Sequence, residues 1–163
     1  MTQIGLLSDT HSHTDEKLIR FFKNCNEIWH AGDIGNVKVL NMLETIAPVK
    51  AVYGNIDGAE LRSFLPEHQR FTIEGMDVWM THIGGYPDRY DQRIKPEIFH
   101  NPPDLFISGH SHILKVINDK KFGLLHINPG AYGKHGLHVV RTAMRFKLHN
   151  ARISDLEIYE LKR

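Results

Sequence analysis

Near its N-terminus the chain carries the stretch Ile4-Gly5-Leu6-Leu7-Ser8-Asp9-Thr10-His11, in which a short apolar run leads into an aspartate and a histidine. Short runs rich in Ile, Leu and Val indicate buried strands. The same order recurs four more times: Gly32-Asp33 follows residues 27–29, Gly54-Asn55-Ile56-Asp57 follows 49–53, His82 follows 78–80, and Gly109-His110-Ser111-His112 follows 105–107. If these strands belong to one open α/β sheet, their polar ends meet at its carboxyl edge, where such folds bind ligands. The pattern therefore predicts one site.

The polar side chains at these strand ends are imidazoles, carboxylates and one amide, without a thiolate. This mixture suits manganese, iron, zinc, cobalt or nickel better than calcium or magnesium alone. One residue separates Asp9 from His11, and one separates His110 from His112, so both members of each pair can turn toward one ion. Asp33 stands alone after its strand. We expect its carboxylate to bridge two ions about 4 Å apart and to offset their repulsion.

The five segments match, in order and spacing, the signature of a known family: they resemble the calcineurin-like metallophosphoesterases. The stretches Leu7-Ser8-Asp9-Thr10-His11 and Ile127-Asn128-Pro129-Gly130 are most similar to the small prokaryotic phosphodiesterases of that family, and the resemblance covers nearly the whole chain. It implies a first metal ion held by Asp9, His11, Asp33 and His112, and a second held by Asp33, Asn55, His82 and His110. Manganese is the favoured metal, with nickel, zinc, iron and cobalt as alternatives.

A phosphodiester repels nucleophiles because it is negatively charged. Two cations neutralise that charge and acidify a bridging water, which is then hydroxide near neutral pH. We expect this hydroxide to attack phosphorus in a small phosphodiester, with Asp33, Asn55 and His82 in the catalytic centre. No protein nucleophile is needed, so Ser8 and Ser111 are expected to form turns and hydrogen bonds with neighbouring ligand loops.

The chain departs from the family signature at Ile56, where most members have a histidine that protonates the leaving group or stabilises charge in the transition state. An isoleucine can do neither. Members of the small prokaryotic branch often have another residue here as well. We therefore expect phosphodiesters with acidic leaving groups to be the better substrates.

Two side chains beside the predicted ligands are candidates for orienting them. His30 precedes Ala31-Gly32-Asp33 and either orients Asp33 or only ends a strand. Asp57 belongs to the family signature, and we expect its carboxylate to orient Asn55 or His11 rather than to bind metal.

Two further histidines are weaker candidates. His13 lies two residues beyond His11. It either donates a hydrogen bond to the phosphate or leaving group, or is an exposed polar residue. His135 lies in a glycine-rich loop that reaches the site beside Asn128 or serves only as a turn.

Two other functions fit the same residues. A phosphomonoesterase or nucleotide pyrophosphatase uses the same metals, but a monoester carries more charge and needs extra cationic donors, for which Arg89, Arg93 and Lys134 are candidates. A non-catalytic scaffold is also known in this fold family: a retromer subunit binds proteins and has lost metal ligands. Here every ligand position is filled, which favours an enzyme, although Ile56 leaves room for a scaffold.

Length and composition set broader limits. The 163 residues predict a single domain, 1–163, and 41% hydrophobic with 24% charged residues is ordinary for a globular protein. A formal charge of +1 disfavours nucleic-acid polymers as partners. The one cysteine, Cys25, cannot form an internal disulfide, and no apolar run approaches a signal peptide or membrane span. We expect a cytoplasmic protein without membrane contact, and exposed edge strands offer a route to homodimers or higher oligomers.

The first third of the chain alternates strands at 4–7, 27–30 and 49–53 with helices that begin at 15–17 and span about 37–46. This alternation implies parallel strands with right-handed crossovers. Runs at 71–73 and 78–80 predict a hairpin, and residues 84–103 predict a loop and short helix beside His82.

The remaining runs, at 115–118, 124–127, 137–142, 144–148 and 156–161, predict a second, mostly antiparallel sheet. Two sheets that bury their apolar faces against each other, with helices outside, give an α/β fold. The expected architecture is a layered α-β-β-α sandwich of two mixed sheets flanked by helices, which is also what the family resemblance implies.

Overall fold

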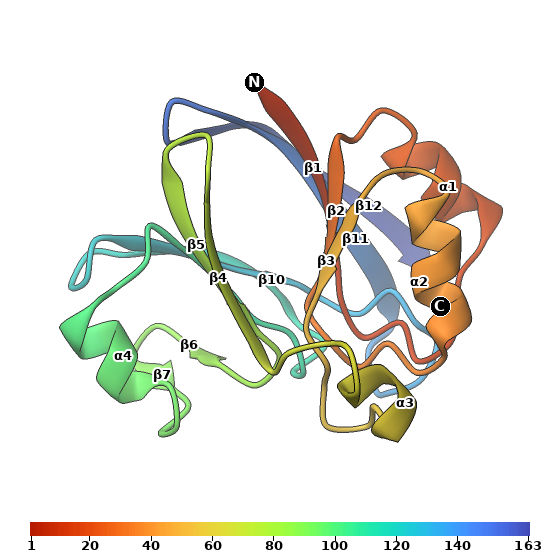
Figure 1. Cartoon of the computed structure of the whole chain (residues 1–163), viewed down its shortest axis with the longest axis horizontal. Coiled ribbons are helices and arrows are strands. Elements are labelled where there is room, and N and C mark those ends of the chain that lie inside the picture. Colours follow the sequence, from red (N-terminus) through yellow and green to blue (C-terminus); the bar gives the residue numbers. More distant parts are fainter.

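The computed structural model describes residues 1–163 and consists mainly of two stacked five-stranded mixed sheets (Figure 1). The first sheet has the order β12-β11-β1-β2-β3, with β1 at Thr2–Leu7, β2 at Glu27–His30, β3 at Val49–Ala51, β11 at Val140–His149 and β12 at Arg152–Lys162. The second has the order β4-β5-β8-β10-β9, with β4 at His68–Ile73, β5 at Met76–Thr81, β8 at Leu105–Ile107, β9 at Leu114–Asp119 and β10 at Leu124–Pro129.

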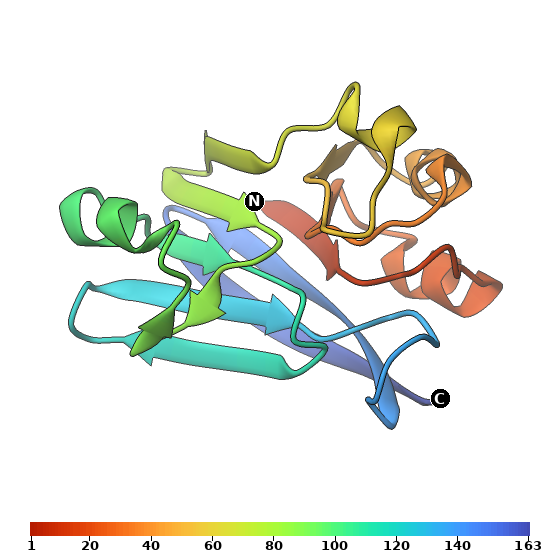
Figure 2. The same ribbon diagram turned by 90° about the horizontal axis from the view of Figure 1, so that it is seen from below.

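Helices cover the outer faces of both sheets. α1 (Glu16–Phe22) and α2 (Val37–Glu44) lie outside the first sheet, while α4 (Lys95–His100) and the short hairpin of β6 (Gly85–Tyr86) and β7 (Arg89–Tyr90) lie outside the second. Figure 2 shows these two groups on opposite sides of the molecule. A further short helix, α3 (Ala59–Arg62), follows β3. The fold is the predicted layered sandwich, and no helix is long and apolar enough to cross a membrane.

Alternation along β1 explains how the layers pack. Ile4 and Leu6 are fully buried in a cluster between the sheets, whereas Leu7 is fully buried in a separate cluster with Leu18 and Phe22 of α1. Successive side chains of a strand point to opposite faces, so one strand supplies both layers. Burying an aliphatic side chain of this size contributes roughly 1.5–3 kcal/mol. β1 therefore joins the inter-sheet core to the helical layer.

The predicted helices near residues 15–17 and 37–46 are present and begin at capping side chains. The carboxylate of Asp15 accepts the backbone N–H of Leu18 at 3.1 Å, and the amide oxygen of Asn36 accepts that of Lys38 at 2.9 Å. Such caps satisfy N–H groups that the first helical turn leaves without partners. Cys25 lies beyond the end of α1 and is buried.

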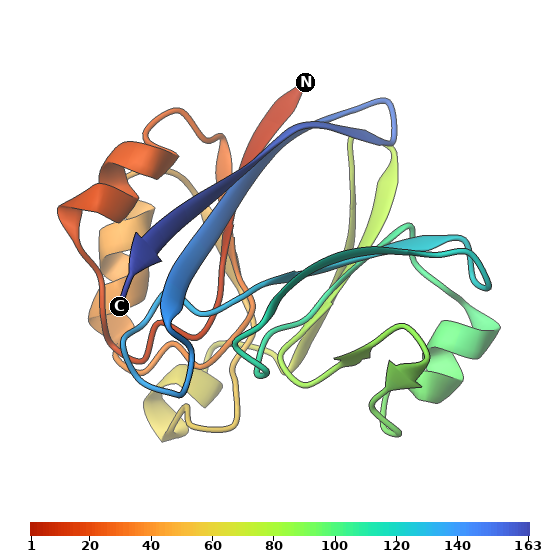
Figure 3. The ribbon, with the colours of Figure 1, turned by 180° about the vertical axis from the view of Figure 1, so that it is seen from behind.

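Two expectations about the sheets were wrong. β11 and β12 belong to the first sheet, where β11 pairs antiparallel with β1, as the view from behind shows (Figure 3). Residues 137–142 and 144–148 are not two strands: β11 begins at Val140, and Leu137 is fully exposed. β2 occupies one edge of β1, so the other edge remained free for a late strand whose Phe146 and Leu148 fill the inter-sheet core.

The ligand-bearing strands also do not share one sheet. β1, β2 and β3 lie in the first sheet, whereas β5 and β8 lie in the second. Parallel pairing of β5 with β8 had no local signal in the sequence. The crevice is therefore formed by strand ends of two stacked sheets rather than by the edge of one.

Two fully buried histidines make the stability of the fold depend on pH. Burial lowers the pKa of both His30 and His126 to about 4. Both are therefore neutral in the folded chain, whereas an unfolded chain protonates them below pH about 6.5. Because the unfolded state then binds more protons, stability falls as the pH drops from about 6.5 to about 4.

We expect His126→Gln to flatten this dependence, because it removes a group that contributes up to about 1.4 kcal/mol per pH unit in that window. The ring centroid of His126 lies 5.5 Å from that of Phe106, and His126 is not among the clustered metal-ligand candidates, so the effect is separable from metal binding. Urea unfolding of chelator-treated protein at several pH values measures the slope. If stability depended on pH equally in the parent and the variant, His126 would titrate alike in the folded and the unfolded chain, and the account would be wrong.

Candidate metal centre

Six of the predicted ligands form two groups at one end of the sandwich. Asp9, His11 and His112 make one, and Asp33, His82 and His110 make the other, with ligand atoms in each group within 4.8 Å of one another. Both groups draw on both sheets: the first from the ends of β1 and β8, the second from the ends of β2, β5 and β8. The stacking of the sheets thus gathers residues far apart in the sequence.

Asp33 faces both groups. Its Oδ2 lies 3.6 Å from Nε2 of His11, and its Oδ1 lies 3.2 Å from Nε2 of His82. The two oxygens of one carboxylate therefore point to different imidazoles, as a bridging ligand requires. Asp9 is also central, because its Oδ1 lies 3.1 Å from Nε2 of His112 and 3.8 Å from Nε2 of His82.

The ligand atoms themselves lack hydrogen-bond partners. Oδ1 of Asp9, Nε2 of His11 and Nε2 of His82 are buried and form no hydrogen bond. Buried polar atoms in proteins are nearly always paired, so a cluster of unpaired ones indicates a ligand. Imidazole nitrogens beside carboxylate oxygens are the donor set of a first-row divalent metal ion. The residues therefore fit such an ion.

Neighbouring groups hold these atoms in place. Oδ2 of Asp9 accepts the hydroxyl of Ser8 at 2.7 Å and the backbone N–H of His110 at 3.0 Å, which leaves Oδ1 free. Nδ1 of His82 donates to the carbonyl of Ala31 at 2.7 Å, so its Nε2 carries a lone pair toward Asp33. The predicted structural role of Ser8 agrees with this hydrogen bond.

The electrostatics of the cluster favour a cation. Burial lowers the pKa of His82, but the nearby carboxylates of Asp33 and Asp9 outweigh it, and the pKa is raised overall. The same carboxylates that stabilise a proton on Nε2 would stabilise a metal ion there. Burial lowers the pKa of His11 and of His110 instead, which keeps both imidazoles neutral and able to coordinate.

The backbone at the ligands is strained. Asp9, His11, Asp33, His110 and His112 all have positive φ, between 45° and 70°. Non-glycine residues reach this region at a cost of about 1–2 kcal/mol each, and such strain concentrates at functional sites. These five side chains are therefore aimed by sharp bends in the loops after their strands.

Glycines permit close approach at two of these bends. A side chain at Gly54 would overlap the carboxylate of Asp33, and one at Gly109 would overlap the hydroxyl of Ser8. Gly54 and Gly109 thus have a steric reason that does not depend on their φ angles.

Asp57 stabilises loops rather than side chains. Its carboxylate accepts the backbone N–H groups of Ile34 at 3.1 Å, Gly35 at 2.8 Å and Gly54 at 2.8 Å. The prediction that Asp57 orients Asn55 or His11 directly was wrong, because its bonds go to the backbone. It joins the loop after β2 to the loop after β3, and so fixes the segments that carry Asp33 and Asn55.

His30 also acts through the backbone. Its Nδ1 accepts the N–H of Gly32 at 3.1 Å, and its Nε2 lies 3.0 Å from the hydroxyl of Thr10, which donates to the carbonyl of Ile34 at 2.9 Å. The pKa lowered by burial keeps this imidazole neutral, as these bonds require. Of the two roles considered for His30, the structure places it where it supports the Asp33 loop.

His13 turns away from the metal-binding groups. Its Nε2 lies 3.3 Å from Asp15, and its ring stacks near Tyr132. Asp15 also accepts the hydroxyl of Tyr132 at 2.6 Å and the guanidinium of Arg141 at 3.0 Å, and these bonds hold its pKa well below its usual range despite partial burial. His13 therefore belongs to a network that attaches α1 to the loop after β10.

That loop brings His135 to the site. The ring centroids of His135 and His11 are 4.9 Å apart, and those of His138 and His112 are 5.0 Å apart. The backbone N–H of Gly133 donates to the carbonyl of Asp9 at 2.9 Å, which holds the loop against the first ligand segment. The glycine-rich loop thus covers the side of the centre formed by His11 and His112.

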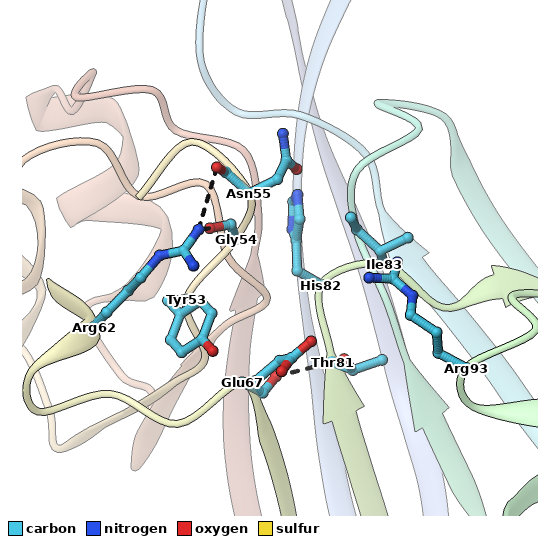
Figure 4. A pocket seen from close by; sticks show the side chains of 9 residues that line it. All are labelled: Tyr53, Gly54, Asn55, Arg62, Glu67, Thr81, His82, Ile83 and Arg93. Atoms are coloured by element: carbon cyan, nitrogen blue, oxygen red, sulfur yellow. Dashed lines mark hydrogen bonds between the residues drawn. The ribbon is translucent and has the colours of Figure 1, made fainter. Parts of the chain in front are cut away.

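Asn55 lies with His82 on a cavity of about 170 Å³ beside the second group. Figure 4 shows Arg62 and Arg93 entering this cavity from opposite sides. Arg62 donates to the carbonyls of Asp57, Gly54 and Asn55, as well as lying over the ring of Tyr53, and Arg93 is paired with Asp91. Both guanidinium groups therefore already have partners.

A second cavity, of about 310 Å³, borders His110 and is lined in part by Tyr86, Arg89 and Lys115. The sequence singled out Arg89 and Arg93, and Tyr86 within the segment 84–103 expected beside His82, but not Arg62 or Lys115. Lys134 lines neither cavity. The helix-forming run Ala59-Glu60-Leu61-Arg62 after the Asn55 segment could have revealed α3 and its arginine. Nothing in the sequence placed Lys115 near Tyr86.

This sandwich, with clustered candidate metal ligands at its strand ends, has the arrangement expected of a metallophosphoesterase. The sequence model of the calcineurin-like phosphoesterase superfamily domain matches residues 2–151, and the chain belongs to that superfamily.

Relatives of known name agree with this membership. A probable metallophosphoesterase of Methanothermobacter thermautotrophicus is 33% identical over 138 residues, which cover 78% of this chain and 76% of that protein. A phosphodiesterase of Methanocaldococcus jannaschii is 29% identical over 146 residues, which cover 78% of this chain and 82% of that protein. Family and relatives thus indicate a metal-binding phosphoesterase.

Solved structures share the fold at lower identity. An archaeal phosphodiesterase superposes with a TM-score of 0.77 at 23% identity, over 98% of this chain and 99% of that one. Vps29 of Chaetomium thermophilum superposes with a TM-score of 0.76 at 15% identity, over 99% of this chain and 97% of that one. At these identities the likeness shows the fold alone.

We expect each of the two ligand groups to bind its own metal ion. His112→Ala should lower the affinity for one ion and His82→Ala the affinity for the other, each by more than about tenfold. Each variant removes a ligand from a different group. Metal content after equilibrium dialysis of chelator-stripped protein against manganese measures this. His13→Ala is the control and should retain the parent's metal content. If it lost metal as well, the division of the ligands into these two groups would be incorrect.

Proposed function

We propose that the chain is a phosphodiesterase with two divalent ions at its catalytic centre. The observation that carries the proposal is Asp33, whose two oxygens face imidazoles of different ligand groups at 3.6 and 3.2 Å. A carboxylate in this position suits a pair of ions better than a single one. The proposed ligands are those predicted from the sequence: Asp9, His11, Asp33 and His112 for one ion, and Asp33, Asn55, His82 and His110 for the other.

When bound, two divalent ions would neutralise charge on the phosphoryl oxygens and make a water acidic enough to attack phosphorus near neutral pH. In the overall reaction the water oxygen forms a bond to phosphorus, one ester P–O bond breaks, and the leaving oxygen takes up a proton. Asp33 and Asp9 orient the centre, because their remaining hydrogen bonds fix the direction of each carboxylate. Asn55 and His82 line the cavity where one ester group can lie.

Ile56 supports Asp33 through its backbone but offers no acid through its side chain. Its backbone N–H donates to Oδ1 of Asp33 at 3.1 Å, so the residue supports the bridging carboxylate. Its side chain is 47% exposed and has no proton to give to a leaving group. Diesters whose leaving groups are already acidic therefore suit this centre.

The two arginines of the cavity beside Asn55 favour a diester over a monoester there. A monoester has an additional negative charge and needs free cationic donors close to phosphorus. Arg62 and Arg93 line the cavity beside Asn55, but Arg62 is engaged with backbone carbonyls and Arg93 with Asp91. Neither is free in the way that a monoester requires.

The ligand chemistry and the sequence also bear on the metal, the substrate and the oligomeric state. Manganese is the proposed metal, because the donors are imidazoles and carboxylates. A small diester in the cytoplasm is the proposed substrate and setting, and the exposed edge strand β12 is a route to a homo-oligomer.

We expect chelator-stripped protein to hydrolyse bis(4-nitrophenyl) phosphate only after manganese, nickel, zinc or magnesium is added back. Asp33→Asn and His110→Ala should each lower kcat by about a hundredfold or more, because each removes a ligand from the charge-stabilising centre. His13→Ala, which points to Asp15, should retain activity.

The parallel assay with 4-nitrophenyl phosphate separates diesterase from monoesterase. Faster turnover of the monoester would replace the proposed activity with a phosphomonoesterase. Failure of protein loaded with two ions to turn over any phosphate ester would instead favour a scaffold.

A further inference from the structure

A cavity of about 310 Å³ beside His110 has a composition that hydrolysis itself does not explain. We call it the Tyr86 pocket; its lining includes Tyr86, Arg89, Asp91, His110, Lys115 and Asn128. It shares Ile83 with the smaller cavity of Figure 4, so the two cavities lie on either side of a common wall near the second ligand group. A diester has two substituents on phosphorus, and the chain offers each a separate space.

The hairpin of β6 and β7 presents Tyr86 and Arg89 on one face. Tyr86 pairs with Arg89, and Gly85 pairs with Tyr90. Directly opposed residues share a face and successive residues alternate, so Tyr86 and Arg89 face away from Tyr90. Tyr90 is buried, and its hydroxyl donates to Asp119 at 2.6 Å. The buried face anchors the hairpin and makes the other face a fixed wall.

Lys115 reaches the same pocket from β9. Its Nζ lies 4.4 Å from the centroid of the Tyr86 ring. It stands opposite Asn128, whose side-chain amide donates to the carbonyl of Gly109 at 2.9 Å and so holds the loop that leads to His110. The ammonium group of Lys115 therefore lies beside the Tyr86 ring, on a strand whose partner holds the loop that carries His110.

The charge of the pocket is positive. Arg89 and Lys115 contribute two cations, and the one carboxylate in the lining, Asp91, is already paired with Arg93 at 2.9 Å. The smaller cavity differs, because its two arginines have partners and Glu67 also lines it. The smaller cavity also has an aromatic ring, Tyr53, but its arginines are already hydrogen-bonded. In the Tyr86 pocket, by contrast, the side chain of neither Arg89 nor Lys115 forms a hydrogen bond or ion pair with the protein.

We propose that the Tyr86 pocket binds one ester substituent of the substrate, and that this substituent is an aromatic or similarly planar group that carries a negative charge. The proposal rests on the proposed function as a phosphodiesterase. A volume of about 310 Å³ is at the lower end of ligand cavities, which suits a single substituted ring. The ring lies against the Tyr86 wall, and its anionic group meets Lys115 and Arg89.

The test compares two diesters that differ by one carboxylate, 4-nitrophenyl 4-carboxyphenyl phosphate and 4-nitrophenyl phenyl phosphate. Chromatography follows loss of the diester, so cleavage at either ester bond is counted. We expect metal-loaded parent protein to prefer the carboxylated diester by about tenfold in kcat/KM, mainly through a lower KM, as for a charge-assisted contact.

Lys115→Met should reduce that preference to nearly one. Lys120→Met is the matched control, because Lys120 is an exposed lysine that follows β9 and does not line the Tyr86 pocket. It should leave the preference at about tenfold. Tyr86→Leu should raise KM for both diesters, since it removes the aromatic wall.

Two results would overturn the assignment: equal kcat/KM for the two diesters in the parent, or a preference that survives Lys115→Met. If the parent cleaves neither diester, the proposed function fails, but the pocket can still be judged by calorimetry with the same two compounds. Tighter binding of the carboxylated diester that depends on Lys115 would then support the pocket, and equal binding would reject it.

Discussion

The carboxylate of Asp33 between His11 and His82 is the contact on which the rest of the structure depends. His11 follows β1 of the first sheet and His82 follows β5 of the second, so this contact links both layers of the sandwich at one end. Oδ1 of Asp33 also accepts the N–H of Ile56 from the loop after β3. The position of one side chain is thus set by strands of both sheets, and in turn sets the spacing of the two ligand groups.

Hydrogen bonds from neighbouring residues hold the buried metal-ligand candidates around Asp33 in place. Asp57 bonds three backbone N–H groups, His30 bonds the N–H of Gly32, and Ser8 directs one oxygen of Asp9. These bonds maintain the strained bends of the ligands and leave the metal-facing atoms without partners. In the absence of a cation the unpaired atoms are destabilising. The fold therefore holds a site that is completed by binding rather than by folding alone.

The sequence predicted what depends on local pattern and missed what depends on distant pairing. Apolar runs before Asp9, Asp33 and His110 predicted the strands, and the family resemblance implied the metal ligands, six of which the structure brings together. The pairing of β11 with β1 joins segments about 140 residues apart and has no local signal, so the sheet order was wrong. Asp57 was misread for a related reason: a carboxylate in a motif suggests a side-chain partner, but its partners are backbone groups that only the folded loops bring near.

The most direct test of the central claim is electron paramagnetic resonance of the protein loaded with manganese. If Asp33 joins two adjacent ions, the fully loaded parent should give the spectrum of a magnetically coupled manganese pair, and the coupling should be lost in Asp33→Asn. A parent spectrum that contains only isolated manganese ions at full loading would contradict a bridged centre. The site would then hold separate ions, and the bridging role of Asp33 would have to be abandoned.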